Sequence, residues 1–164
     1  MENAVEVFKG YVQRLAEKLK IEGLQVDDEN TCYLAFDEKF FVRCSFDKEK
    51  EQIEYLGYIG ALPEDGADYY QGILESCHFW RDTAGSNVSF DPEDGTLTLQ
   101  QFCDINFMND DYFYKVMEDF VNAMDHWNSK RRQEWEEHPT ASPSADVPAA
   151  GPVGIDPNMM MFGA

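Results

Sequence analysis

Apolar residues recur at every third or fourth position in the first twenty residues, with charged and amide side chains between them. They are Val5, Phe8, Val12, Leu15 and Leu19. This spacing places them on one face of an amphipathic helix, which we predict over residues 4–20. Gly23 follows at a suitable place to end that helix, because glycine accepts the left-handed backbone conformation found at helix C-termini.

The next three segments have the alternating pattern of a β-sheet. Apolar side chains occupy every second position in residues 31–36 and 41–46, and the charged residues 37–39 between them predict a hairpin turn. Residues 52–59 alternate less regularly and offer apolar side chains to both faces. We therefore expect a three-stranded meander, which Gly60 and Pro63 end because neither residue continues a strand comfortably.

A second helix and a β-hairpin are predicted next. Residues 65–80 carry an apolar surface wider than one helix face, and a helix of this kind usually has a second packing partner. Residues 87–90 and 96–101 both alternate, and the sequence Asp94-Gly95 lies between them. This dipeptide is a strong hairpin signal because both residue types tolerate positive φ.

The last predicted helix begins at Asn109-Asp110-Asp111 and closes with Lys130-Arg131-Arg132. The first group suits the free amides and the positive end of a helix, and the second suits its negative end. The resulting element order, α-β-β-β-α-β-β-α, predicts an α+β fold in which a twisted antiparallel sheet packs against helices.

The composition changes after residue 137. Five of the seven prolines lie in residues 138–164, among alanine, serine and glycine. We predict a compact domain over residues 1–137 and a flexible tail rich in proline and alanine over residues 138–164. The apolar end of this tail, residues 159–162, is either a short docking motif or an inert end.

Acidic residues strongly outnumber basic ones, 32 against 13, and the formal net charge is −19. Such a field repels nucleic-acid phosphates and anionic membranes, so we expect neither as a direct ligand, although a well-solvated surface explains the charge equally well. No apolar run approaches the length of a membrane span, and the N-terminus lacks the features of a signal peptide. We therefore expect a cytosolic protein, and the four cysteines, which lack zinc-ligand spacing, are expected to be free core residues.

The sequence contains no recognisable catalytic or metal-binding arrangement. His78, His126 and His138 form no H-x-x-x-H pair, and the neighbours Cys77 and His78 point in different directions on a helix. Read as a calcium loop, the turn around Asp94-Gly95 has its glycine one position early and a phenylalanine where glutamate is required. We therefore predict a protein that is not an enzyme and that uses no cofactor and no metal.

Aromatic residues make up 14% of the chain, which is more than one small core needs. A part of them should therefore be exposed, and contiguous exposed apolar patches mark binding surfaces. An acidic shell around such patches would keep the free protein soluble. Composition thus favours a binding protein.

Four segments, read in order, carry a resemblance to a known family. They are the acidic turn and strand Asp27-Asp28-Glu29-Asn30-Thr31-Cys32-Tyr33-Leu34-Ala35-Phe36-Asp37, the junction Gly60-Ala61-Leu62-Pro63 with the following Ile73-Leu74-Glu75-Ser76-Cys77, the hairpin Val88-Ser89-Phe90-Asp91-Pro92-Glu93-Asp94-Gly95-Thr96-Leu97-Thr98-Leu99, and the closing helix from Phe120-Val121 to Trp127. Over about residues 4 to 132, this set resembles the class I type III secretion chaperones of bacteria, the Tir chaperone (CesT) family.

The resemblance implies a cytoplasmic homodimer that binds the non-globular N-terminal segment of one secreted effector and keeps it export-competent without ATP or metal. The effector would add extended strands and fill apolar grooves. For effector contact the family layout indicates Val5, Phe8, Val12, Leu34, Phe36, Val42 and Cys44. For the dimer interface it indicates Tyr70, Ile73, Leu74, Cys77 and Trp80. About half of each set is equally explained as ordinary core. The tail exceeds the minimal family pattern and is a candidate site for a partner such as the secretion ATPase.

One alternative function uses the carboxylates rather than the aromatic residues. In this interpretation the chain is an acidic inhibitory protein or a nucleic-acid mimic, and its binding weakens steeply with salt. Effector binding through apolar surface would weaken much less. An enzyme is the third interpretation, and loss of an activity on mutation of Cys77 or His78 would support it.

Overall fold

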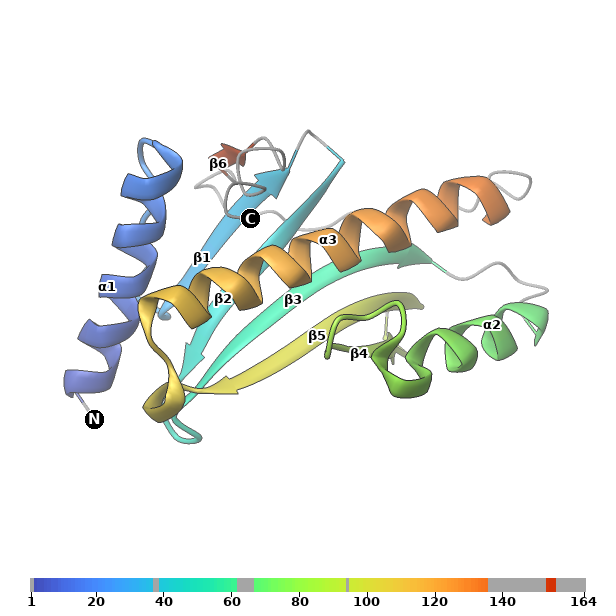
Figure 1. Cartoon of the computed structure of the whole chain (residues 1–164), viewed down its shortest axis with the longest axis horizontal. Coiled ribbons are helices and arrows are strands. Elements are labelled where there is room, and N and C mark those ends of the chain that lie inside the picture. Colours follow the sequence, from blue (N-terminus) through green and yellow to red (C-terminus); the bar gives the residue numbers. More distant parts are fainter. Residues whose placement is uncertain (1, 37–38, 62–66, 94, 136–152, 156–164) are drawn as a thin grey trace.

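The computed structural model describes residues 2–36, 39–61, 67–93, 95–135 and 153–155. The elements in chain order (Figure 1) are α1 (Glu2–Leu19), β1 (Thr31–Phe36), β2 (Phe40–Asp47), β3 (Gln52–Ala61), α2 (Ala67–Cys77), the 3-10 turn η1 (His78–Trp80), β4 (Asn87–Asp91), β5 (Thr96–Asp104), the 3-10 turn η2 (Ile105–Phe107), α3 (Asp110–Trp135) and β6 (Val153–Ile155). The predicted α+β fold is confirmed, and each predicted helix and strand is present.

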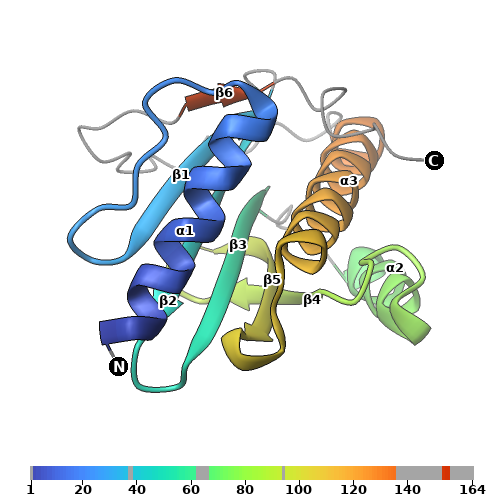
Figure 2. The ribbon, with the colours of Figure 1, turned by 60° about the vertical axis from the view of Figure 1, so that its left-hand side comes forward.

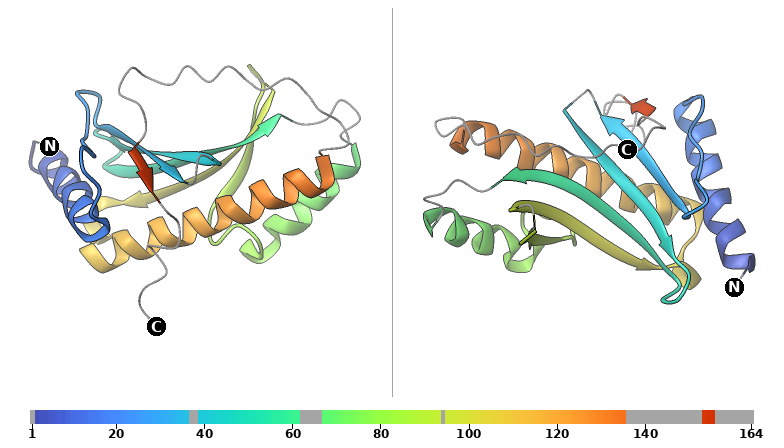
Figure 3. Two further views of the ribbon diagram at one scale, coloured as in Figure 1. Left: turned by 90° about the horizontal axis from the view of Figure 1, so that it is seen from above. Right: turned by 180° about the vertical axis from the view of Figure 1, so that it is seen from behind.

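The strands form one sheet in the order β4-β5-β3-β2-β1-β6. Strands β1 to β5 pair antiparallel with their neighbours, and only β6 pairs parallel, against β1. Figure 3, seen from above, shows α1 and α3 on one face of the sheet, and Figure 2 shows α2 beside β4 at the end away from α1. In the part of the chain that the structure describes, no helix lies on the opposite face.

The hydrophobic core lies between the sheet and the two helices α1 and α3. Burial alternates along β2 and β3, so every second side chain of these strands faces the helices. The largest fully buried side chains are Trp127, Tyr55, Phe8, Phe36, Phe113 and Phe120. Burial of each such side chain contributes roughly 1.5–3 kcal/mol.

Polar contacts fix α1 against the start of α3. The Tyr11 hydroxyl donates to the Met108 carbonyl oxygen at 2.8 Å, and the Tyr114 hydroxyl donates to the Arg14 carbonyl oxygen at 2.6 Å. The Arg14 guanidinium also pairs with Asp110 at 2.7 Å. These contacts set the position of α1 beside the β1 edge of the sheet.

Helix ends differ from the predictions in two places. Helix α1 ends at Leu19, before Gly23, because Lys20 itself takes the left-handed conformation (φ 54°) and the Ile21 amide donates to the Ala16 carbonyl oxygen at 2.9 Å. Helix α3 begins where predicted, with the Asn109 side chain accepting from the Tyr112 amide at 2.9 Å. It continues past the basic run to Trp135.

Two further predictions about chain breaks are corrected. Gly60 does not end the third strand; it lies within β3, at a register irregularity that its positive φ of 132° accommodates. The second helix ends at Cys77 rather than residue 80, and η1 follows it. The predicted turn at residues 37–38 and the start of the second helix at residues 65–66 lie outside the described residues.

The predicted tail is described only at β6. A strand was not predicted there, and its pairing with β1 is a finding of the structure. The apolar end at residues 159–162 lies outside the described residues, and the domain boundary after residue 137 stays a prediction. None of the helices in the described ranges is long and apolar enough to cross a membrane.

Candidate partner-binding surfaces

Helix α2 exposes large apolar side chains at one end of the molecule. Tyr70 and Leu74, four residues apart and so on one helix face, are 50% and 72% exposed. Ile73 and Cys77 are half-buried on the neighbouring face. Trp80, in η1, is 58% exposed. The five residues expected at a dimer interface are therefore all exposed or half-buried, as an interface with a second chain requires.

The turn after α2 holds two aromatic residues in an unusual backbone conformation. Phe79 and Trp80 have consecutive positive φ values of 52° and 53°, and both side chains are exposed. A left-handed conformation costs a bulky residue roughly 1–2 kcal/mol. We name the exposed set Tyr70, Leu74, Phe79 and Trp80 the α2 patch. Phe79 and Trp80 are exposed, so in the isolated chain no burial of their side chains offsets the cost of their backbone conformation.

Hydrogen bonds hold the end of α2 against α3. The Trp127 indole donates to the Asp82 carbonyl oxygen at 3.0 Å, and the Lys130 ammonium donates to the Ser76 hydroxyl at 3.1 Å. Ser76 is fully buried. Partial burial opposes ionisation of Asp82, but hydrogen bonds from Ser76 and Arg81 hold the pKa of this carboxyl below its usual value. These polar contacts therefore fix the segment that carries the α2 patch against α3.

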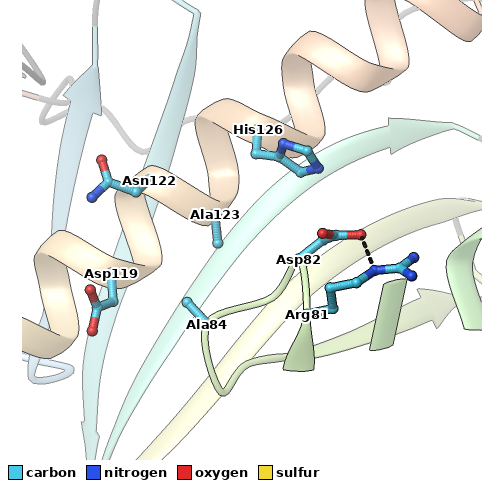
Figure 4. Close-up of a pocket in the computed structure, with 7 residues that line it drawn as sticks. All are labelled: Arg81, Asp82, Ala84, Asp119, Asn122, Ala123 and His126. Atoms are coloured by element: carbon cyan, nitrogen blue, oxygen red, sulfur yellow. Dashed lines mark hydrogen bonds and ion pairs between the residues drawn. The ribbon is translucent and has the colours of Figure 1, made fainter. Parts of the chain in front are cut away.

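A pocket of about 250 Å³ lies between this segment and α3 (Figure 4). Its lining residues are Arg81, Asp82, Ala84, Asp119, Asn122, Ala123 and His126. Figure 4 shows the Arg81–Asp82 ion pair, 3.4 Å long, on the side opposite Asp119 and Asn122. The lining contains two carboxylates and an imidazole and no serine or cysteine.

The effector-contact set is mostly core. Phe8, Leu34, Phe36, Val42 and Cys44 are fully buried and Val12 is 2% exposed, so these six side chains are inaccessible to a partner in this conformation. Val5 alone is half-buried. The strand members of the set are buried because of strand parity, since these positions of β1 and β2 face α1 and α3, while Phe8 and Val12 lie on the face of α1 that packs on the sheet. Contact of the set with an effector stays a prediction.

The side chains at the alternate positions of the same strands are the accessible ones. Tyr33, Ala35, Phe41, Leu56 and Tyr58 are half-buried and lie on the sheet face opposite the helices. The Phe41 and Tyr58 rings are in contact, with centroids 5.8 Å apart. The predicted effector-contact set does not include these residues. Their signal in the sequence is the pair of aromatic residues at positions that the helix-facing pattern leaves outside.

Arg43 lies on this face, among these side chains. Its Nε atom is buried and has no hydrogen-bond partner within the described residues. Tyr33 has a raised pKa, chiefly through partial burial, and the nearby Arg43 charge opposes that increase. The face thus combines aromatic surface with a buried guanidinium donor that has no partner within the described residues.

Three cysteines lie in the core. Cys32, Cys44 and Cys103 are buried and free. Burial, with a hydrogen bond to Cys32, raises the pKa of the Cys44 thiol well above its usual value, and burial also raises the pKa of Cys103. Cys77 is the fourth and is half-buried on α2. Among the residues that the structure describes, no group of three His, Cys, Asp or Glu side chains could hold a metal ion.

Comparison with known proteins completes this description. The sequence model of the Tir chaperone protein (CesT) family matches residues 11–128. No curated protein matches the chain.

Three solved structures have a similar fold. The chaperone–effector complex of HopA1 and SchA contains a chain that is similar over 79% of this chain and 98% of its own length, with 19% identity and a TM-score of 0.65. The ExsC–ExsE complex gives 74% and 90% coverage, 16% identity and a TM-score of 0.61. The Yersinia pestis type III secretion chaperone SycH in complex with a stable fragment of YscM2 gives 72% and 97% coverage, 17% identity and a TM-score of 0.56.

Proposed function

The chain belongs to the Tir chaperone protein (CesT) family, as its ordered motifs indicated, and we propose that it is a bacterial type III secretion chaperone. In this proposal it binds the non-globular N-terminal segment of an effector and keeps that segment soluble and ready for export. The neighbours with similar folds support this function, since their structures include a chaperone–effector complex and a type III secretion chaperone bound to a protein fragment.

The observation that carries the proposal is the pairing of an extended segment with the edge of the sheet. Leu34, Ala35 and Phe36 of β1 pair with Val153, Gly154 and Ile155. An edge that accepts one extended segment through main-chain bonds can accept another, because such bonds do not depend on side-chain identity. The aromatic residues of the adjoining helix-free face would supply the pockets that select the segment.

The α2 patch supports a homodimer. Four large apolar side chains are exposed within residues 70–80, and contiguous apolar surface of this kind marks protein interfaces. Burial in a twofold contact would offset the backbone cost of the Phe79–Trp80 turn. The interface proposed is thus the predicted set, Tyr70, Ile73, Leu74, Cys77 and Trp80, with Phe79 added.

The proposed chaperone works in the cytoplasm, without ATP or metal, and is not an enzyme. Its binding energy comes from strand addition and apolar burial, neither of which consumes a nucleotide. The net charge of −19 would keep this apolar surface soluble in the free protein and disfavour nucleic-acid ligands. A contact with the secretion ATPase remains a proposal for the tail alone.

Co-expression with the secreted protein encoded beside this gene tests the function. The complex is purified and its mass measured by size-exclusion chromatography with light scattering, at low and at high salt. We expect the mass of two chains plus one partner at both salt concentrations. A complex that dissociates at high salt would favour the acidic inhibitor or mimic, because charge-driven binding is screened. Absence of any complex would contradict the chaperone.

A further inference from the structure

Strand β6 differs from the rest of the sheet in direction and in origin. It pairs parallel to β1, whereas every other pair is antiparallel. It also lies outside the residues that the family model matches, 11–128. Figures 1 and 2 show it at the outer edge of the sheet, near the C-terminal end of α1. It is therefore an addition that this chain makes to the matched fold.

Only part of the β1 edge is available for pairing. The Thr31 amide donates to the Asp27 carboxylate at 2.8 Å, and the Thr31 carbonyl accepts from the Asp27 amide at 2.8 Å. Alternate residues of a strand turn their N–H and C=O groups to opposite sides. Since Thr31 faces the edge, Tyr33 and Ala35 face it too, while Leu34 and Phe36 turn toward β2. The edge therefore offers two residues for main-chain bonds.

Strand β6 covers Ala35 and reaches Tyr33. In a parallel pair, a residue that faces its neighbour bonds to the two residues that flank its register partner. The partner of Ala35 is Gly154, so Ala35 bonds to Val153 and Ile155. The partner of Val153 is Leu34, so Val153 bonds to the Tyr33 carbonyl as well as to the Ala35 amide. Within the described part of β1, the internal strand thus leaves the Tyr33 amide to a longer segment.

The energy of this contact suits a strand that can be displaced. A main-chain hydrogen bond contributes roughly 0.5–1.5 kcal/mol net, and the register gives Ala35 two such bonds and Tyr33 one. The pairing is intramolecular, which offsets this weakness because the strand does not dilute away from the edge. The edge is then occupied in the free chain without being closed permanently.

We propose that Val153–Ile155 is an internal placeholder strand, which holds the β1 edge in the free protein and is displaced by a longer extended segment that also bonds to the Tyr33 amide. The inference rests on the proposed function for the nature of that segment, the non-globular part of a secreted protein. Only chains whose edge is free can bind such a segment. The placeholder therefore lowers the apparent affinity in proportion to the fraction of chains with a free edge. Short or poorly matched segments are thereby rejected.

Amide hydrogen exchange of the full-length chain, resolved by NMR, tests the placeholder without any partner. The variant is Ile155→Pro, which removes the N–H that bonds to the Ala35 carbonyl, and the matched control is Ala150→Pro, which adds a proline outside the strand. If β6 occupies the edge of the wild-type chain about 90% of the time, the Ala35 amide is free to exchange in about a tenth of the chains. We therefore expect this amide to exchange about tenfold or more faster in Ile155→Pro than in the wild type. The Leu34 and Phe36 amides, which face β2, should be unchanged in both variants. An Ala35 amide that is equally fast in the wild type would overturn the proposal.

Displacement is tested with a fluorescein-labelled synthetic peptide of this chain's residues 150–158, followed by fluorescence anisotropy. It should bind the Ile155→Pro chain about tenfold more tightly than the wild type or Ala150→Pro. Equal binding, or binding to none of the three, would contradict a displaceable strand. Neither measurement uses the secreted protein, so failure of the co-expression experiment and failure of the placeholder are separate results.

Discussion

Gly57 of β3 lies directly beneath the side chain of Met124 of α3. A Cβ atom at position 57 would stand 2.4 Å from the Met124 sulfur and 2.7 Å from its methyl carbon. Met124 is fully buried, so its side chain has no solvent side to move to. The close approach of α3 to the sheet therefore requires glycine at this position.

Gly57→Ala is expected to destabilise the fold by about 1–3 kcal/mol, because it overpacks a filled core. The free energy of unfolding, measured by urea titration, checks this. The double variant Gly57→Ala with Met124→Ala should lose less than the sum of the two single changes, because the added methyl group occupies part of the space that the shortened Met124 side chain vacates. Strict additivity would show that the two side chains do not meet.

Leu74→Asp should convert the proposed dimer into a monomer. Leu74 is 72% exposed in the chain, so the change does not disturb the core, but a carboxylate in an apolar interface is costly to bury. Light scattering should give half the wild-type mass. Phe107→Asp is the matched control, since Phe107 is 80% exposed but lies in η2, away from the α2 patch, and it should remain a dimer. A dimeric Leu74→Asp would move the interface elsewhere.

In the monomeric Leu74→Asp chain, Cys77 should be the only one of the four cysteines to react rapidly with Ellman's reagent. Cys32, Cys44 and Cys103 are buried, and the raised pKa values of Cys44 and Cys103 keep these thiols in the unreactive protonated form. In the Leu74→Asp variant Cys77 should react faster than in the wild type, where the partner subunit would cover it. Equal rates would argue against its place at the interface.

The stability contributed by Asp82 should disappear in acid. The folded state holds the pKa of this carboxyl below its unfolded value of roughly 4, so its contribution is present above that value. It is lost as the pH falls through the lower folded pKa. The urea midpoint of Asp82→Asn should therefore lie below that of the wild type near neutral pH, and the two should converge in acid. Glu93→Gln, on the exposed turn between β4 and β5, is the control and should show no such convergence.

The fold was largely predictable because each element has a local signal. Residues close together in the sequence show each signal: the three- and four-residue spacing in α1, the alternation in β1 and β2, and the Asn109 cap of α3. The end of α1 was not, because Lys20 takes a conformation that glycine usually takes. Its cost is met by the Ile21–Ala16 hydrogen bond, which sequence spacing does not reveal.

The exposure of the expected site residues was predicted less well than the fold. The expected interface residues Tyr70, Leu74 and Trp80 are exposed, whereas Phe8 and Leu34, expected to contact a partner, are fully buried in the single chain. An alternating pattern shows that two faces differ without showing which face the helices cover. Strand β6 was missed for another reason, because its pairing with β1 joins segments more than a hundred residues apart, and three residues carry no periodicity.

Synthesis order gives the β6–β1 pairing a further consequence. Domains generally fold as units, so the β1 edge forms once α3, which ends at Trp135, has left the ribosome. Val153 follows about 18 residues later, which corresponds to about 1–4 s at 5–20 residues per second. During that interval the edge of the folded nascent domain is open. A partner segment translated nearby therefore meets an unoccupied strand, whereas a segment that arrives after the last residue has emerged must first displace the chain's own end. Whether two proteins meet during translation or after it would thus decide how fast they combine.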